Sequence, residues 1–126
     1  MQLTMENTGD ANRIHSYAPG EVVINGLSYR STTVVMPGEL LADWGPKTVA
    51  ALGATEFHAL LELTPELIIV GTGSRQVFPA REFMVPAIEA GIGIEAMTTP
   101  AACRTYNVLV AEQRRAMAVL FMMQER

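Results

Sequence analysis

The second half of the chain alternates continuous apolar runs with segments of helical periodicity. The predicted elements are a strand at Leu67–Val70, a helix over 80–90, a strand over 92–97, a helix from Thr98 or Thr99 to about 113, and a strand over 115–123. The run Leu67–Val70 is apolar throughout, which is typical of a central strand covered on both faces. Gly91 would end the first helix. Strand, helix, strand, helix, strand predicts an α/β fold.

The residue pattern in the first third of the chain is typical of β-strands. Val22–Ile24 is a short apolar run, and Asn25-Gly26 directly after it is the strongest short signal for a hairpin turn. We expect a strand to resume over Leu27–Val35 and to end at Pro37-Gly38. These strands should add to the sheet or form a flanking hairpin layer.

A short helix is predicted over residues 56–63, between the β-rich third and the central strand. Thr55 would cap it, and Pro65 would stop it. Phe57, Leu60 and Leu61 would face inward.

Length and composition fit a single α/β domain over residues 1–126, with residues 1–12 as a loose tail. The 126 residues are 49% hydrophobic and 17% charged, enough to bury a core without disulfides or metal. The mean hydropathy of +0.21 fits either a rich core or an apolar surface used by a partner, including a second copy in a homodimer. The net charge of −4 argues against nucleic acid as a partner.

The sequence shows no targeting signal and no membrane-spanning segment. The longest apolar run, 116–123, is shorter than the roughly 20 residues that cross a bilayer. A single cysteine, Cys103, excludes an internal disulfide and is compatible with a reducing cytoplasm. His15 and His58 are isolated, so we expect no metal and no cofactor. The expected location is the cytoplasm.

The last predicted helix carries the densest set of specific polar groups. On a helical wheel Cys103, Tyr106 and Val110 face the sheet, whereas Arg104 and Asn107 project together from the other side. A ligand- or partner-binding role and a purely structural role are both open for these groups. The candidates on this helix and at its exit are Arg104, Thr105, Tyr106, Asn107, Glu112 and Arg114.

The second candidate is the loop Gly71-Thr72-Gly73-Ser74-Arg75, which follows the central strand. In open α/β sheets ligands gather at the carboxyl ends of strands, where glycines expose backbone N–H groups to an anion. Gln76 stands where a dinucleotide fingerprint has its third glycine, so a nucleotide site is disfavoured. A tight turn that needs glycine is the structural alternative. The candidates here are Gly71, Gly73, Ser74 and Arg75.

These motifs also carry a resemblance. The run Gly71-Thr72-Gly73, the strand segment Gly91–Thr99, the helix segment Ala102–Leu109 and the downstream Glu112 with Arg114-Arg115 resemble a small uncharacterised α/β family. Its mitochondrial member is NADH:ubiquinone oxidoreductase complex assembly factor 3. The resemblance implies a three-layer α/β fold with a central mixed sheet flanked by helices and an accessory N-terminal β-hairpin layer. It implies no established activity.

Two functional hypotheses follow. The first is a non-catalytic interaction module with a protein partner, such as an assembly factor for a respiratory or other multiprotein complex. The second is a binder or enzyme for a small anionic molecule, with a site between the Gly71–Arg75 loop and the helix that carries Arg104 and Asn107. The residues contain no recognisable acid–base or nucleophilic constellation, so no reaction is predicted.

Overall fold

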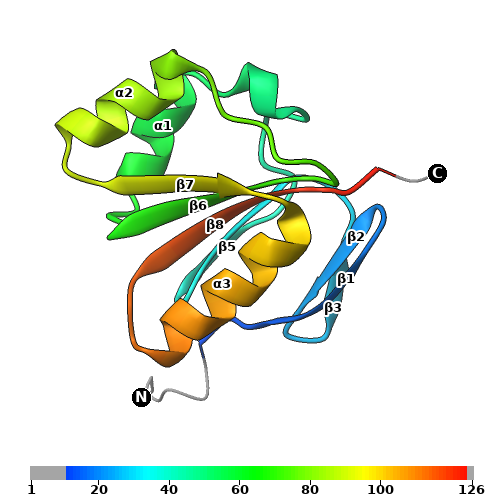
Figure 1. Ribbon diagram of the computed structural model, residues 1–126. Helices are drawn as coiled ribbons and strands as arrows, with labels where there is room; N and C mark the ends of the chain where they lie inside the picture. Colours follow the sequence, from blue (N-terminus) through cyan, green and yellow to red (C-terminus); the bar gives the residue numbers. More distant parts are fainter. Residues whose placement is uncertain (1–10, 125–126) are drawn as a thin grey trace.

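The computed structural model describes residues 11–124 as two sheets and three α-helices (Figure 1). The strands are β1 (Ile14–Ala18), β2 (Glu21–Ile24), β3 (Leu27–Tyr29), β4 (Thr33–Met36), β5 (Glu39–Leu41), β6 (Leu67–Thr72), β7 (Gly93–Met97) and β8 (Ala116–Phe121). The helices are α1 (Ala54–Leu61), α2 (Arg81–Glu89) and α3 (Thr99–Ala111), with a short 3₁₀ helix η2 (Val49–Ala51) before α1.

The central sheet is mixed and has the strand order β5-β4-β8-β6-β7. β6 pairs in parallel with both β7 and β8, whereas β4 pairs antiparallel with β5 and β8. Every residue of β8 is buried, as expected for a strand covered on both faces. The expected central mixed sheet is therefore confirmed.

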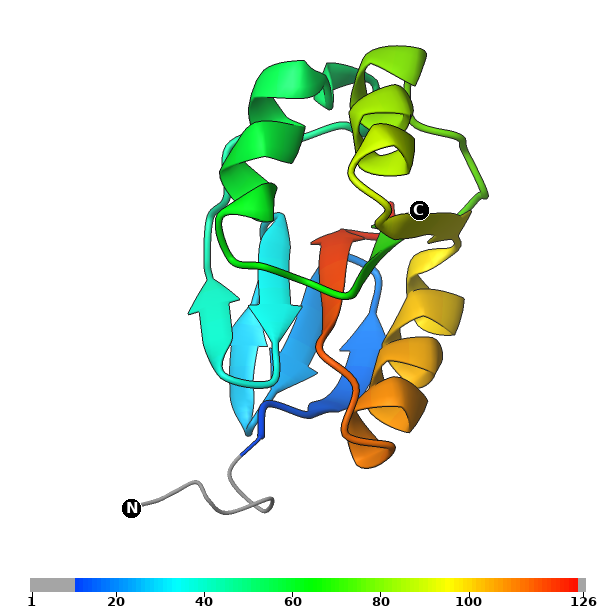
Figure 2. The same cartoon turned by 90° about the vertical axis from the view of Figure 1, so that its left-hand side faces the viewer.

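Three layers enclose two hydrophobic cores, as the two views show (Figures 1 and 2). α1 and α2 cover one face, where Phe57 and Phe83 meet edge to face with ring centroids 5.9 Å apart. α3 and the small sheet β1-β2-β3 cover the other face, around Tyr106 and Ile24. The accessory N-terminal layer is confirmed, and it has three strands.

The Asn25-Gly26 hairpin is confirmed. Both residues have positive φ, 53° and 85°, as a turn with matching right-handed twist requires, and β2 and β3 pair antiparallel across them. The single strand predicted over Leu27–Val35 was wrong. It breaks after Tyr29, and Thr33–Met36 belongs to the central sheet instead of the small one.

Helix boundaries differ from the predictions by one or two residues. α1 begins after Gly53, not Thr55, because the Glu56 carboxylate accepts the Gly53 N–H at 2.9 Å. α3 ends at Ala111, two residues before Gln113, which adopts a φ of 64°. Thr98 is the N-terminal cap of α3, one of the two residues predicted for that role.

The loose tail predicted for residues 1–12 lies outside the described residues up to position 10. Asn12 lies within them and is tightly held, which contradicts that prediction at this position. Its side-chain amide donates to the carbonyl oxygens of Met36 and Glu39 at 2.8 and 3.0 Å. Its own carbonyl accepts the Tyr106 hydroxyl at 2.9 Å.

Candidate functional site

The loop that follows β6 is held by hydrogen bonds between its own residues. The Thr72 hydroxyl donates to the Arg75 carbonyl at 2.6 Å and accepts the Val77 N–H at 3.2 Å, closing the loop on itself. Gly73 has a φ of 96°, which glycine adopts without strain. The tight turn expected here is therefore present.

Thr99, at the start of α3, connects this loop to the end of β8. Its hydroxyl accepts the Gly73 N–H at 2.8 Å and donates to the Phe121 carbonyl at 2.5 Å. Only 1% of Thr99 is exposed, so both hydrogen bonds are shielded from water. Three segments far apart in sequence are therefore joined through one side chain.

Gly71 is a packing residue. A Cβ at this position would lie 3.0 Å from the Ala102 Cβ and 3.1 Å from Thr99, so α3 rests directly on the strand. The Gly73 N–H is also occupied by Thr99. These two glycines therefore serve the contact of the loop with α3.

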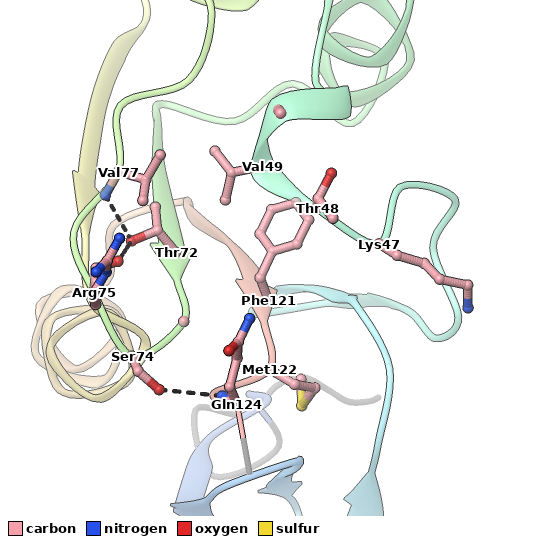
Figure 3. A pocket seen from close by; sticks show the side chains of 12 residues that line it. Lys47, Thr48, Val49, Thr72, Ser74, Arg75, Val77, Phe121, Met122 and Gln124 are labelled. Atoms are coloured by element: carbon pink, nitrogen blue, oxygen red, sulfur yellow. Dashed lines mark hydrogen bonds between the residues drawn. The ribbon is translucent and has the colours of Figure 1, made fainter. Parts of the chain in front are cut away.

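A groove of about 680 Å³ opens beside this loop, at the ends of β6 and β8 (Figure 3). Its described walls come from three segments: residues 47–50, the loop after β6, and residues 121–124 at the end of β8. The lining residues are Lys47, Thr48, Val49, Ala50, Thr72, Gly73, Ser74, Arg75, Val77, Phe121, Met122 and Gln124. Gly73, Ser74 and Arg75 are the sequence-predicted residues that line it.

Apolar side chains form the middle of the groove and cations its two sides. In Figure 3 Val49 and Phe121 lie centrally, with Val77 and Arg75 on one side and Lys47 on the other. Among the described residues that line the groove none is acidic, although the chain as a whole carries a net charge of −4. The groove thus pairs an apolar floor with positively charged sides.

Phe78 follows Val77 in sequence and is one of the most exposed large apolar residues among those described. Val77 is 42% and Phe78 71% exposed. We call the groove together with Phe78 the groove face. Two consecutive exposed apolar residues, one of which lines the groove, extend its apolar surface, and contiguous apolar surface of this kind marks interaction sites.

The sequence-predicted candidates Arg104, Thr105 and Asn107 on α3 do not line the groove. The Asn107 side chain forms two hydrogen bonds to the backbone of Ile14. Its amide oxygen accepts the Ile14 N–H at 3.0 Å, and its amide nitrogen donates to the Ile14 carbonyl at 2.7 Å. The exposed Arg104 donates to the Tyr17 hydroxyl at 2.8 Å, and Thr105 reaches the Met97 sulfur. The structure thus brings Arg104 and Asn107 to the β1 layer, and neither lines the groove.

Tyr106 and Cys103 lie on the inward face of α3, as predicted. The Tyr106 hydroxyl donates to Asn12, and burial raises its pKa above the usual range. Burial likewise raises the pKa of the Cys103 thiol to about 12. At neutral pH this thiol is protonated and unreactive.

Arg114 and Arg115, which follow the C-terminal end of α3, form hydrogen bonds to residues 63–66 just before β6. The Arg115 backbone N–H, and then the Arg114 guanidinium at 3.1 Å, hold the pKa of the Glu66 carboxyl below its usual value. Glu112 is exposed at the end of α3 and forms no ion pair within residues 11–124. Arg114 therefore has a structural partner.

Some residues of the groove face gave no signal in the sequence. Lys47, Val49 and Phe121 lie in segments separated by many residues from the Gly71–Arg75 loop, and no spacing rule joins them. Val77-Phe78 was readable in principle, because two large apolar residues follow a polar loop directly and precede Pro79. Among the described residues, no group of three or more His, Cys, Asp and Glu could hold a metal ion.

A family model described as a protein of unknown function, DUF498/DUF598, matches residues 14–121. The chain belongs to this family. A solution structure from Bordetella pertussis, described as a Mth938-like domain, superposes with a TM-score of 0.79 at 27% identity, covering 99% of this chain and 94% of that one. The three-layer fold is shared with it.

Two curated relatives carry functional or locational names. The Danio rerio protein named NADH dehydrogenase [ubiquinone] 1 alpha subcomplex assembly factor 3 is 33% identical over 109 residues, 85% of this chain and 62% of the relative. The Francisella tularensis protein named 13 kDa major membrane protein is 26% identical over 106 residues, 82% of this chain and 85% of the relative. Within residues 11–124, no helix has the length and apolar character needed to cross a membrane.

Proposed function

We propose that this chain is a non-catalytic protein-interaction module, of the kind that assists assembly of a multiprotein complex, and that its partner binds the groove face. The observation that carries the proposal is the exposed pair Val77 and Phe78 beside a groove with an apolar floor. Aromatic residues and arginine dominate the binding energy of protein interfaces, and Arg75 adjoins this pair.

The rigidity of the loop supports this use. Thr72, Thr99 and Gln76 anchor it, the last by donating to the Ala96 carbonyl at 2.8 Å. A surface that is already ordered loses little conformational entropy when it binds. The assembly-factor name of the vertebrate relatives supports the same class of function.

A matched pair of variants tests the proposal. Phe78→Ser and Ile88→Ser each remove one apolar side chain of nearly equal exposure, 71% and 70%. Both should leave the free energy of unfolding within about 0.5 kcal/mol of the parent protein. Affinity capture from the native host, quantified by mass spectrometry, should lose its principal partner with Phe78→Ser and keep it with Ile88→Ser.

Equal capture by both variants would contradict the proposal. The capture is run on cytoplasmic and membrane fractions, because the sequence favours the cytoplasm whereas the Francisella relative is named a membrane protein. The same experiment tests for the homodimer expected from the apolar composition. If it forms, two differently tagged copies of the chain are captured together.

Binding of a small anionic ligand is the second candidate, and the two cations of the groove favour it. The groove volume of about 680 Å³ is in the range of small-molecule sites. Arg75 and Lys47, however, lie on opposite sides of the apolar floor, so one small anion would engage only one of them. A ligand of this kind would raise the melting temperature of the parent protein and not that of Arg75→Ala.

A further inference from the structure

We infer that the occupant of the groove is an extended peptide segment of the partner in which apolar residues are flanked by acidic ones. The inference rests on the proposed function, since it names the chemistry of the partner at the same face. Its basis is the arrangement of charge and apolar surface across the groove, in the order cation, apolar floor, cation.

The first part of the argument is charge. Within residues 11–124, Lys47 and Arg75 are the charged residues that line the groove, and both are cations. The ion pairs found within residues 11–124 join Arg30 to Glu21 and Arg114 to Glu66, so they use neither groove cation. In a chain with more acidic than basic residues, two such cations around one groove are complementary to carboxylates.

The second part is the spacing of the cations. Arg75 belongs to the loop after β6, and Lys47 precedes η2, on the other side of the groove. Val49 and Phe121 lie between them, and Val77 extends the apolar surface on the side of Arg75. An occupant that meets both cations must cross this floor, so it carries apolar groups in its middle and negative charge towards each end.

The third part concerns shape. The groove is partly open to solvent and is not an enclosed cavity, so a segment of another chain can enter it. In an extended peptide alternate side chains point to the same side, so apolar residues can fill the floor while acidic residues reach the sides.

A peptide library provides the test. Random short peptides displayed on phage are selected against the whole protein, and the enriched sequences are read. We expect apolar residues flanked by aspartate or glutamate. For a synthetic enriched peptide, fluorescence anisotropy should show an affinity loss of about tenfold or more in Lys47→Glu and Arg75→Glu. Raising the salt concentration should also weaken binding in the parent protein.

Arg30→Glu is the matched control, since it changes the net charge equally at an exposed cation outside the groove. Its affinity should stay within about twofold of the parent protein, because steering by a remote charge is screened. Thermal melting of each variant confirms that the fold is retained. An equal loss in Arg30→Glu and Arg75→Glu would overturn the assignment to the groove.

The remaining outcomes separate the inference from the proposed function. Enrichment of peptides without acidic flanks would overturn the inference, while loss of capture in Phe78→Ser would keep the interaction module. No enriched peptide, together with binding to phosphatidylserine vesicles that Arg75→Glu abolishes, would assign the face to a membrane surface instead. No enrichment together with unchanged capture by Phe78→Ser would overturn both.

Discussion

Thr99→Val is expected to lower the free energy of unfolding by about 2–4 kcal/mol, as measured by chemical denaturation. Valine has nearly the shape of threonine, so the packing on Gly71 is retained and the hydroxyl alone is lost. The Gly73 N–H and the Phe121 carbonyl would then be left without this partner in a buried site. Removing one partner of a buried hydrogen bond costs about 1–3 kcal/mol for each group.

The same change should loosen the groove. Thr99 joins the loop after β6 to the end of β8, and both segments line the groove. Amide hydrogen exchange at Gly73 should therefore be faster in Thr99→Val than in the parent protein. Thr99→Ser, which keeps the hydroxyl, is the control and should show a smaller loss of stability. A valine variant as stable as the serine variant would refute this role for the hydroxyl.

Asn107→Ala is expected to lower the free energy of unfolding by about 2 kcal/mol. The side-chain amide satisfies both backbone groups of Ile14, whose own side chain is buried in the second core. Alanine favours helix by about 0.5 kcal/mol over asparagine, so propensity alone predicts the opposite sign. A lower free energy of unfolding would therefore be due to the lost hydrogen bonds between Asn107 and Ile14 in β1.

Val108→Ala, at an exposed neighbour in the same helix, is the control for Asn107→Ala and should change stability by less than about 0.5 kcal/mol. The Ile14 amide should exchange faster with solvent in Asn107→Ala. Unchanged exchange at Ile14 would contradict the view that this asparagine holds β1 onto α3.

The elements with strong local signals were predictable from sequence. Leu67–Val70 lies in the central sheet because its continuous apolar run can be buried only on both faces. Asn25-Gly26 forms its hairpin because both residues accept positive φ. On α3, the spacing of Cys103, Tyr106 and Val110 identified the buried face.

Elements whose signal is not local were missed. β5 has three residues, too few to show a period, and its pairing with β4 becomes visible only in the sheet. The break between β3 and β4 carries neither glycine nor proline. The chain turns there because Thr33 continues into the central sheet beside β8.

The candidate site was predicted only in part, for the same reason. Gly73, Ser74 and Arg75 were found because a glycine-rich loop after a central strand is a local pattern. Asn107 looked like an outward ligand group on a helical wheel, and its partner Ile14 is 93 positions away in sequence. A wheel shows which side of a helix a residue occupies, but not which other segment covers that side.

Site-specific photo-cross-linking tests the central claim most directly. A photoreactive phenylalanine analogue is placed at position 78 and, as the matched control, at position 88, which is equally exposed. After irradiation of living cells, the groove face account predicts one reproducible protein adduct from position 78 and none from position 88. It also predicts that Arg75→Glu weakens that adduct. Adducts of equal yield from both positions, or none from position 78, would contradict it.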